Sequence, residues 1–168
     1  MSYKLHNGLF FIEHNNTFFI PAMDEEHDGT LNFDKTVFPF LYKQMTGDFE
    51  LCTNFIPTNM SLGDSYGLKA MVDNNLYTYI TLVYSNEGLK IKSGICDVFR
   101  LEDSDKLVNC ENVTLKIVKS NNIIETFYSL DGINFVSCGK NTMVCAEMSI
   151  GYTVSSFNGS DFFIKVKN

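Results

Sequence analysis

The sequence contains no tryptophan, only three prolines and no long hydrophobic segment. Its purely apolar runs, such as residues 9–12, are only a few residues long, so none could span a bilayer as a helix. Positive charge is also scarce, because 13 Lys and Arg face 20 Asp and Glu, for a net charge of −7. A chain without a basic stripe is poorly suited to follow a phosphate backbone or an anionic lipid surface. We therefore predict neither nucleic acid nor a membrane as a partner.

The cysteines do not form the pattern of a disulfide framework. Their number is odd and no two have C-x-x-C spacing, whereas such frameworks are normally even and come with an export signal. The N-terminal residues lack a basic segment followed by an apolar one. We expect free, mostly buried thiols in a reducing compartment and a cytoplasmic location. The five residues are Cys52, Cys96, Cys110, Cys138 and Cys145.

The composition is that of an ordinary globular protein. Apolar residues make up 45% of the 168 residues and charged residues 20%, which is enough apolar material for one sizeable core. We find no linker, low-complexity tract or internal repeat. The sequence therefore predicts one domain over residues 1–168.

Alternating patterns predict β-strands almost everywhere. The chain has 15 Phe and 8 Tyr, and its β-branched residues cluster between short polar turns. Pro57 ends the clearest alternating segment, residues 47–56, whose predicted apolar face carries Phe49, Leu51, Thr53 and Phe55. No window shows a convincing helical stripe, so we expect little helix. Further strands are predicted at residues 76–84, 89–96, 113–119, 123–129, 134–138, 148–155 and 162–166.

The spacing of these strands favours an all-β sandwich of two sheets. Residues 85–88 predict a tight hairpin between two of them. Asp131 and Gly132 read as a second hairpin turn, in which glycine supplies a positive φ angle. We prefer this interpretation to a ligand-binding loop.

Three stretches, in this order, resemble one known family. They are residues 38–42 (FPFLY) with 46–51 (TGDFEL), residues 66–77 (YGLKAMVDNNLY), and residues 127–135 (FYSLDGINF). Together they look like the DUF1349 proteins, and the resemblance spans roughly residues 10–167. It implies a concanavalin A-like jelly roll of two antiparallel sheets, related to the C-terminal module of family 43 β-xylosidases. The family implies a carbohydrate-related setting and no general activity. Where its members often carry Trp, Lys and Glu, this chain has Tyr77, Tyr79 and Val83.

The carboxylates do not match the glucanases of this fold. The motif Glu-x-Asp-x-x-Glu, which resemblance to those enzymes would require, is absent, so its paired-carboxylate hydrolysis is not expected. The nearest acidic run, residues 102–105, has the wrong spacing and is predicted to form a polar loop. No local signature pairs a Cys with one of the three histidines as a nucleophile. We predict no catalytic residues, although an enzyme of unusual mechanism remains an alternative.

An acidic segment near the N-terminus is a candidate calcium-binding loop. Asp24, Glu26 and Asp28 alternate, but Lys35 stands where a closing glutamate should be, so an EF-hand is rejected. Two interpretations of this segment remain: a looser calcium site built from Asp24, Asp28 and backbone carbonyls, and a solvated acidic loop. His14 and His27 lack the partners of a zinc site. No other cofactor is expected.

Aromatic residues are the strongest remaining feature. On the predicted strand 76–84, Tyr77 and Tyr79 share one face, and sugars stack their C–H faces on such rings. Lys92 or Tyr128 from neighbouring strands would join them at a shallow groove. Packing in the core or at its rim is the more common role of aromatics in a chain this rich in Phe. Our functional hypothesis is a non-catalytic carbohydrate-binding module, with a protein-interaction module as a further alternative.

Overall fold

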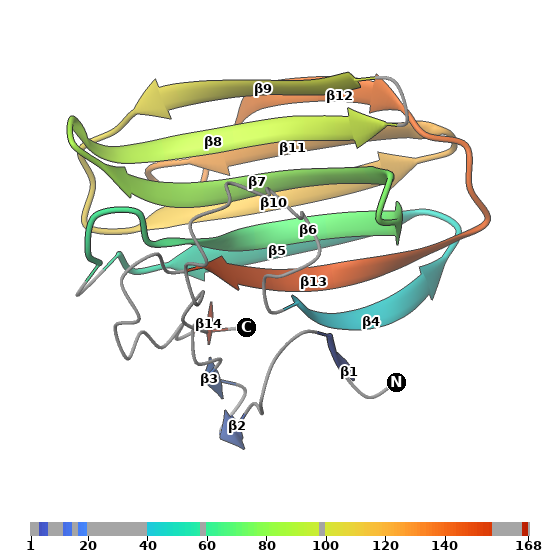
Figure 1. Ribbon diagram of the computed structural model, residues 1–168, viewed down its shortest axis with the longest axis horizontal. Helices are drawn as coiled ribbons and strands as arrows, with labels where there is room; N and C mark the ends of the chain where they lie inside the picture. Colours follow the sequence, from blue (N-terminus) through green and yellow to red (C-terminus); the bar gives the residue numbers. More distant parts are fainter. Residues whose placement is uncertain are drawn as a thin grey trace, which may run out of the picture.

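The structure, a computed structural model, describes residues 4–6, 12–14, 17–19, 40–57, 60–97, 100–155 and 166–167. Every regular element in these ranges is a β-strand, which confirms the predicted all-β class. Within the described ranges no helix is long and apolar enough to cross a membrane. The strands form two antiparallel sheets, which we call sheet A and sheet B (Figure 1).

Sheet A lies in front in Figure 1 and contains seven strands within the described ranges. In spatial order they are β1 (Lys4–His6), β4 (Phe40–Thr46), β13 (Glu147–Ser155), β6 (Ser65–Asp73), β7 (Leu76–Ser85), β8 (Gly88–Asp97) and β9 (Arg100–Leu107).

Sheet B lies behind it and, in the part of the chain that the structure describes, also contains seven strands. In spatial order they are β12 (Val136–Thr142), β11 (Ile123–Ser129), β10 (Val113–Ser120), β5 (Phe49–Phe55), β14 (Val166–Lys167), β3 (Thr17–Phe19) and β2 (Ile12–His14). Of the predicted strand 162–166, only its last residue lies within the described part of the chain.

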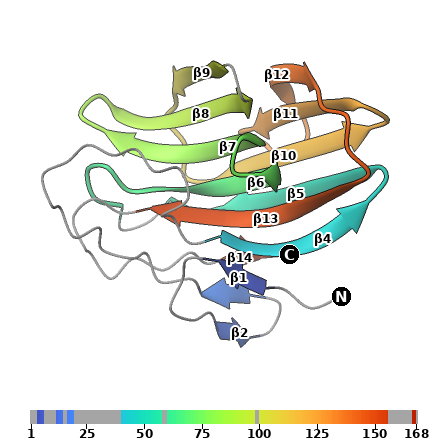
Figure 2. The same ribbon diagram turned by 45° about the vertical axis from the view of Figure 1, so that its right-hand side comes forward.

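The two sheets face each other as layers (Figure 2), and the hydrophobic core lies between them. Strand β5 shows how the sequence directs this packing, because its buried and exposed residues alternate without exception. The predicted face of β5 points inward, while Glu50, Cys52 and Asn54 point to solvent. Sheet A contributes side chains such as Leu68, Ile80 and the fully buried Tyr152. A side chain of leucine or isoleucine size gains about 1.5–3 kcal/mol from such burial.

Tight turns join consecutive strands as the sequence predicts. Strands β7 and β8 form a hairpin in which Ser85 pairs with Gly88, whose φ of 116° suits glycine. Strands β10 and β11 pair through the turn at Asn121, which has a φ of 55°. The buried Lys119 donates hydrogen bonds to the carbonyls of Gly47 and Asn121 and so links two turns.

The turn after β11 confirms the structural interpretation of its Asp-Gly pair. Gly132 has a φ of 76°, in the left-handed region that favours glycine. The Asp131 carboxylate accepts hydrogen bonds from the Ser129 hydroxyl and from the backbone N–H groups of Ile133 and Asn134. These bonds favour the charged carboxylate and hold the pKa of Asp131 well below its ordinary value.

One expectation about the acidic run is wrong. Residues 102–105 lie on the edge strand β9 instead of in a loop. Strand β9 pairs with β8 along its length, so that Lys90 and Lys92 lie opposite Leu107 and Asp105. An edge strand tolerates a high charge because one side of it faces no neighbouring strand. Lysines on β8 also supply partners for the acidic residues.

Candidate functional site: a lysine among aromatic rings on sheet A

The strand register brings several predicted site residues onto the outer face of sheet A. On β7, Ile80 and Leu82 belong to the core, so Tyr77 and Tyr79 point away from it. Tyr79 lies between Lys69 on β6 and Gly94 on β8. Lys92 lies two residues before Gly94 and therefore faces the same way.

Tyr79 is held by its neighbours on β8 and β9. A Cβ atom on Gly94 would lie only 2.8 Å from the Tyr79 hydroxyl, so the tyrosine ring crosses β8 at a position where no side chain intervenes. The hydroxyl donates a hydrogen bond to Asp103, which also forms an ion pair with Lys92 at 2.8 Å. Burial, followed by the negative charge of Asp103, raises the pKa of Tyr79. The ring, the carboxylate and the ammonium group therefore form one connected unit.

Tyr77 is packed more tightly than expected for a ring on which a sugar stacks. It is only 6% exposed, whereas Tyr79 is half-buried. The two ring centroids are 6.3 Å apart, and the Tyr77 hydroxyl donates a hydrogen bond to the Cys96 sulfur. Burial raises the pKa of Tyr77. We therefore assign Tyr77 a supporting position beneath the face and Tyr79 the more accessible ring.

Sequence reasoning missed three members of this site. Phe40 and Tyr42 on β4 stack on each other, with centroids 5.2 Å apart and planes 17° from parallel. The Lys69 ammonium group stands 4.4 Å from the Tyr77 ring centroid and 5.5 Å from that of Phe40. The one available signal was a single lysine within the otherwise mostly apolar run of residues 66–72. We call these five residues (Phe40, Tyr42, Lys69, Tyr77 and Tyr79) the outer-face cluster.

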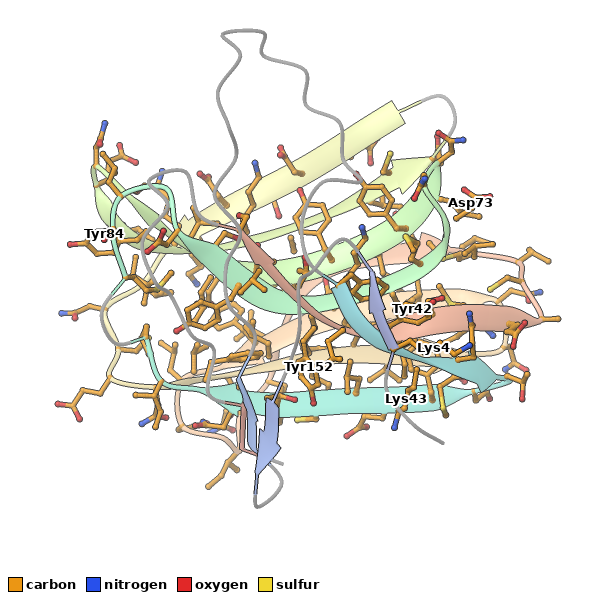
Figure 3. The ribbon with its side chains drawn as sticks, turned by 60° about the horizontal axis from the view of Figure 1, so that its bottom comes forward. Lys4, Tyr42, Lys43, Asp73, Tyr84 and Tyr152 are labelled. Carbon is orange, nitrogen blue, oxygen red and sulfur yellow. The ribbon has the colours of Figure 1, made fainter. Side chains whose placement is uncertain are left out.

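Figure 3 shows where Tyr42, one member of this cluster, lies on sheet A. Tyr42 and its pairing partner Lys4 lie at the β1–β4 side of the sheet. Tyr84 and Asp73 lie at opposite ends of the strands. By strand order the outer-face cluster extends from β4 to β7, and Asp103 on β9 lies beyond it.

Tyr128 does not join this site. It lies on β11 of sheet B, faces the core and is only 4% exposed. Lys106 on β9 donates a hydrogen bond to the Tyr128 hydroxyl at 2.5 Å and stands 5.2 Å from the ring centroid. The predicted contact with Tyr77 and Tyr79 is therefore wrong, because the two faces belong to different sheets. Tyr128 instead packs between the layers.

Two hollows lie elsewhere in the described part of the chain. One of about 240 Å³ opens between the sheets, beside β9 and β12, and is lined by hydroxyl groups such as those of Ser93 and Thr126. The other, of about 480 Å³, lies at the end of the β7–β8 hairpin and is lined by Tyr84, Leu107 and Cys110, among others. The first lacks an aromatic ring, and the second lacks the paired lysine and aspartate found beside Tyr79.

The structure does not test the calcium prediction. Asp24 and Asp28 lie outside the described residues, as does His27. Within the described ranges, no group of three or more His, Cys, Asp or Glu side chains could hold a metal ion.

No family model matches the sequence, and no curated protein matches it. Solved structures nevertheless share its fold over most of the chain. The first is a functionally unknown protein from Saccharomyces cerevisiae, with a TM-score of 0.78 and 10% identity. The alignment covers 98% of this chain and 91% of the yeast chain. The fold is the concanavalin A-like jelly roll.

Two further structures with this fold belong to proteins whose names refer to carbohydrates. Carbohydrate-binding module CBM66 from Bacillus subtilis has a TM-score of 0.63 and 9% identity, with 100% of this chain and 93% of the module covered. Xylan β-1,4-xylosidase from Bacillus halodurans C-125 has a TM-score of 0.68 and 12% identity. There the alignment covers 89% of this chain and 31% of the enzyme, so the chain corresponds to about a third of that protein.

Proposed function

We propose that this protein is a non-catalytic carbohydrate-binding module whose site is the outer face of sheet A. The observation that carries the proposal is the unit formed by the Tyr79 ring, Asp103 and Lys92. Sugars present C–H groups to aromatic faces and hydroxyl groups to charged partners, and this unit offers both kinds of contact within a small area. The likeness of the fold to a carbohydrate-binding module supports the proposal at the level of protein class.

The expected affinity is low. The site offers a half-buried aromatic ring and few polar anchors, so it gains little free energy to offset the ordering of a flexible saccharide. In the finer form of the proposal, the protein is an accessory module of the DUF1349 type, acting alone or beside a glycoside-processing partner. The match of this chain to only 31% of the longer xylosidase supports that setting.

A thermal-shift screen with neutral mono- and oligosaccharides tests the proposal. A ligand that binds the native state raises the melting temperature by mass action, so even millimolar binding is measurable at high ligand concentration. We expect at least one saccharide to produce a rise of a few degrees in the native protein. Replacing Tyr79 by Ala removes the stacking surface and should lower the affinity about tenfold or more.

Tyr84→Ala is the matched control, since Tyr84 is an exposed tyrosine on the same strand but outside the outer-face cluster. It should bind as the native protein does. Loss of binding in Tyr84→Ala but not in Tyr79→Ala would move the site to the hollow at the β7–β8 hairpin. A flat response to every saccharide would exclude the proposed function in this form.

A further inference from the structure

Lys69 occupies an unusual position for a charged side chain. It extends from the outer face of sheet A, where its neighbours across the register are Tyr79 on one side and Gly151 on the other. Because Gly151 has no side chain, nothing from β13 separates Lys69 from the rings of β4 at this level. The ammonium group stands between the rings of Phe40 and Tyr77, which come from strands on opposite sides of β6.

The charge of Lys69 has no carboxylate partner within the described part of the chain. The two aspartates of β9 on this face are engaged elsewhere, since Asp103 pairs with Lys92 and Asp105 with Lys90. None of the ion pairs or hydrogen bonds among the described residues uses Lys69. Aromatic faces stabilise a cation by about 0.5–2 kcal/mol, which replaces only part of its lost hydration. Burial accordingly lowers the pKa of Lys69 to about 8.

A ligand could supply the missing negative charge. A carboxylate placed against the Lys69 ammonium group would form a charge-assisted hydrogen bond in partly desolvated surroundings, where such bonds are strong. Tyr79 is the residue opposite Lys69 on the neighbouring strand β7, so a ligand held at Lys69 would have an aromatic ring on the adjacent strand to stack on. The acidic group and the sugar ring would then be recognised by adjacent side chains.

We propose that Lys69 binds an acidic group of the ligand, so that the outer-face cluster recognises a saccharide carrying a uronic acid. This inference rests on the proposed function. A single lysine matches the single charge of a carboxylate, whereas Asp103 and Asp105 on the same face disfavour a more highly charged group. The net charge of −7 also repels long polyanions. The ligand class is therefore a saccharide with one acidic residue among neutral ones.

Two aldobiouronic acids, glucuronosyl-xylose and galacturonosyl-rhamnose, provide the test. Each is offered as the free acid and as its methyl ester, which keeps the shape of the sugar and removes the charge. Calorimetry should give at least tenfold tighter binding for one free acid than for its ester. Lys69→Met should abolish this preference, and Lys69→Arg, which keeps a positive charge, should retain part of it. Circular dichroism and thermal melting establish that both variants fold.

The outcomes separate this inference from the proposed function. Equal binding of acid and ester, or a preference that survives in Lys69→Met, overturns the role of Lys69 while neutral binding stands. Neutral saccharides that bind while both acids fail also overturn it. A sulfated disaccharide that binds as tightly as the acid overturns the choice of a carboxylate. If no saccharide binds at all, the proposed function fails and this inference fails with it.

Discussion

Lys69 is a residue whose charge opposes folding. In the unfolded chain its pKa is the ordinary 10.5, and burial in the native protein lowers it to about 8. When a cationic group has a lower pKa in the folded than in the unfolded state, its charge destabilises the folded state. The cost is 1.36 kcal/mol for each pKa unit of the difference. With allowance for its partial exposure, the penalty is about 1–3 kcal/mol. A residue that lowers stability on a candidate binding face is the pattern expected where function and stability conflict.

Replacing Lys69 by methionine should therefore stabilise the protein. We expect the free energy of unfolding near pH 7 to rise by about 1–3 kcal/mol, as measured by urea denaturation, because methionine keeps the packing and removes the charge. Lys92→Met is the control. Its side chain is more exposed and is paired with Asp103, so its loss should change stability by less than about 1 kcal/mol. Lower stability in Lys69→Met would contradict the assignment of an unfavourable charge.

The effect of Lys69→Met on the free energy of unfolding should depend on pH. The penalty is fully present below the native pKa of about 8 and disappears as the pH rises towards 10.5, because the native state then releases its proton first. The gain in the free energy of unfolding from Lys69→Met should therefore shrink as the pH rises from about 8 to 10.5. The titratable groups around Lys69 are Tyr42 on β4, which is in register with it through Gly151, Tyr77 and Tyr79 on β7, and Cys96 on β8. Burial raises the pKa of Tyr77 and Tyr79, so both stay neutral where Lys69 titrates.

At the scale of elements, the β11–β12 turn depends on one carboxylate. Its hydrogen bonds lower the pKa of Asp131, so its contribution to stability is present above about pH 4 and is lost as the pH falls through the native value. Asp131→Ala should lower the melting temperature at pH 7, and the difference from the native protein should narrow below pH 4. Glu111→Ala, at an exposed acidic position, should show neither effect. A constant difference between pH 7 and pH 3 would contradict this mechanism.

Strand β8 carries the second element-scale prediction. In Gly94→Ala the new Cβ atom would lie 2.5 Å from the Glu102 carbonyl oxygen and would displace the Tyr79 ring. We expect a loss of about 1–3 kcal/mol in stability and weaker saccharide binding. Gly139→Ala on β12 is the matched control, since its nearest neighbour, the Thr126 hydroxyl, is 3.9 Å away. Equal effects of the two substitutions would show that Tyr79 does not depend on Gly94.

At the scale of the whole molecule, the sequence predicts those features of the fold that depend on a single strand or turn. Alternation predicted the buried face of β5, and a glycine turn predicted the β7–β8 hairpin. The same alternation placed Tyr77 and Tyr79 on one face. It failed for β9, because an edge strand with charged partners on β8 has the composition of a loop.

The site depends instead on the order of strands in space. Phe40 and Lys69 meet because β4, β13 and β6 are neighbours in sheet A, and no local pattern reveals that order. Tyr128 was misplaced for the same reason, since its own strand gives no indication of which sheet it joins. Composition and periodicity therefore predict the architecture, whereas the lysine at the centre of the outer-face cluster requires the assembled sheet.

The charged edge strand also affects how the molecule meets other chains. Strands β9 and β12 lie together at one side of the sandwich in Figures 1 and 2, and each ends its sheet there. Free backbone groups at such an edge can pair with another chain and start aggregation. The acidic run on β9 repels a second copy of itself, and the register shift beside Phe127 interrupts the regular pairing of β12 with β11. A charged edge of this kind disfavours fibril-like association of an aromatic-rich chain.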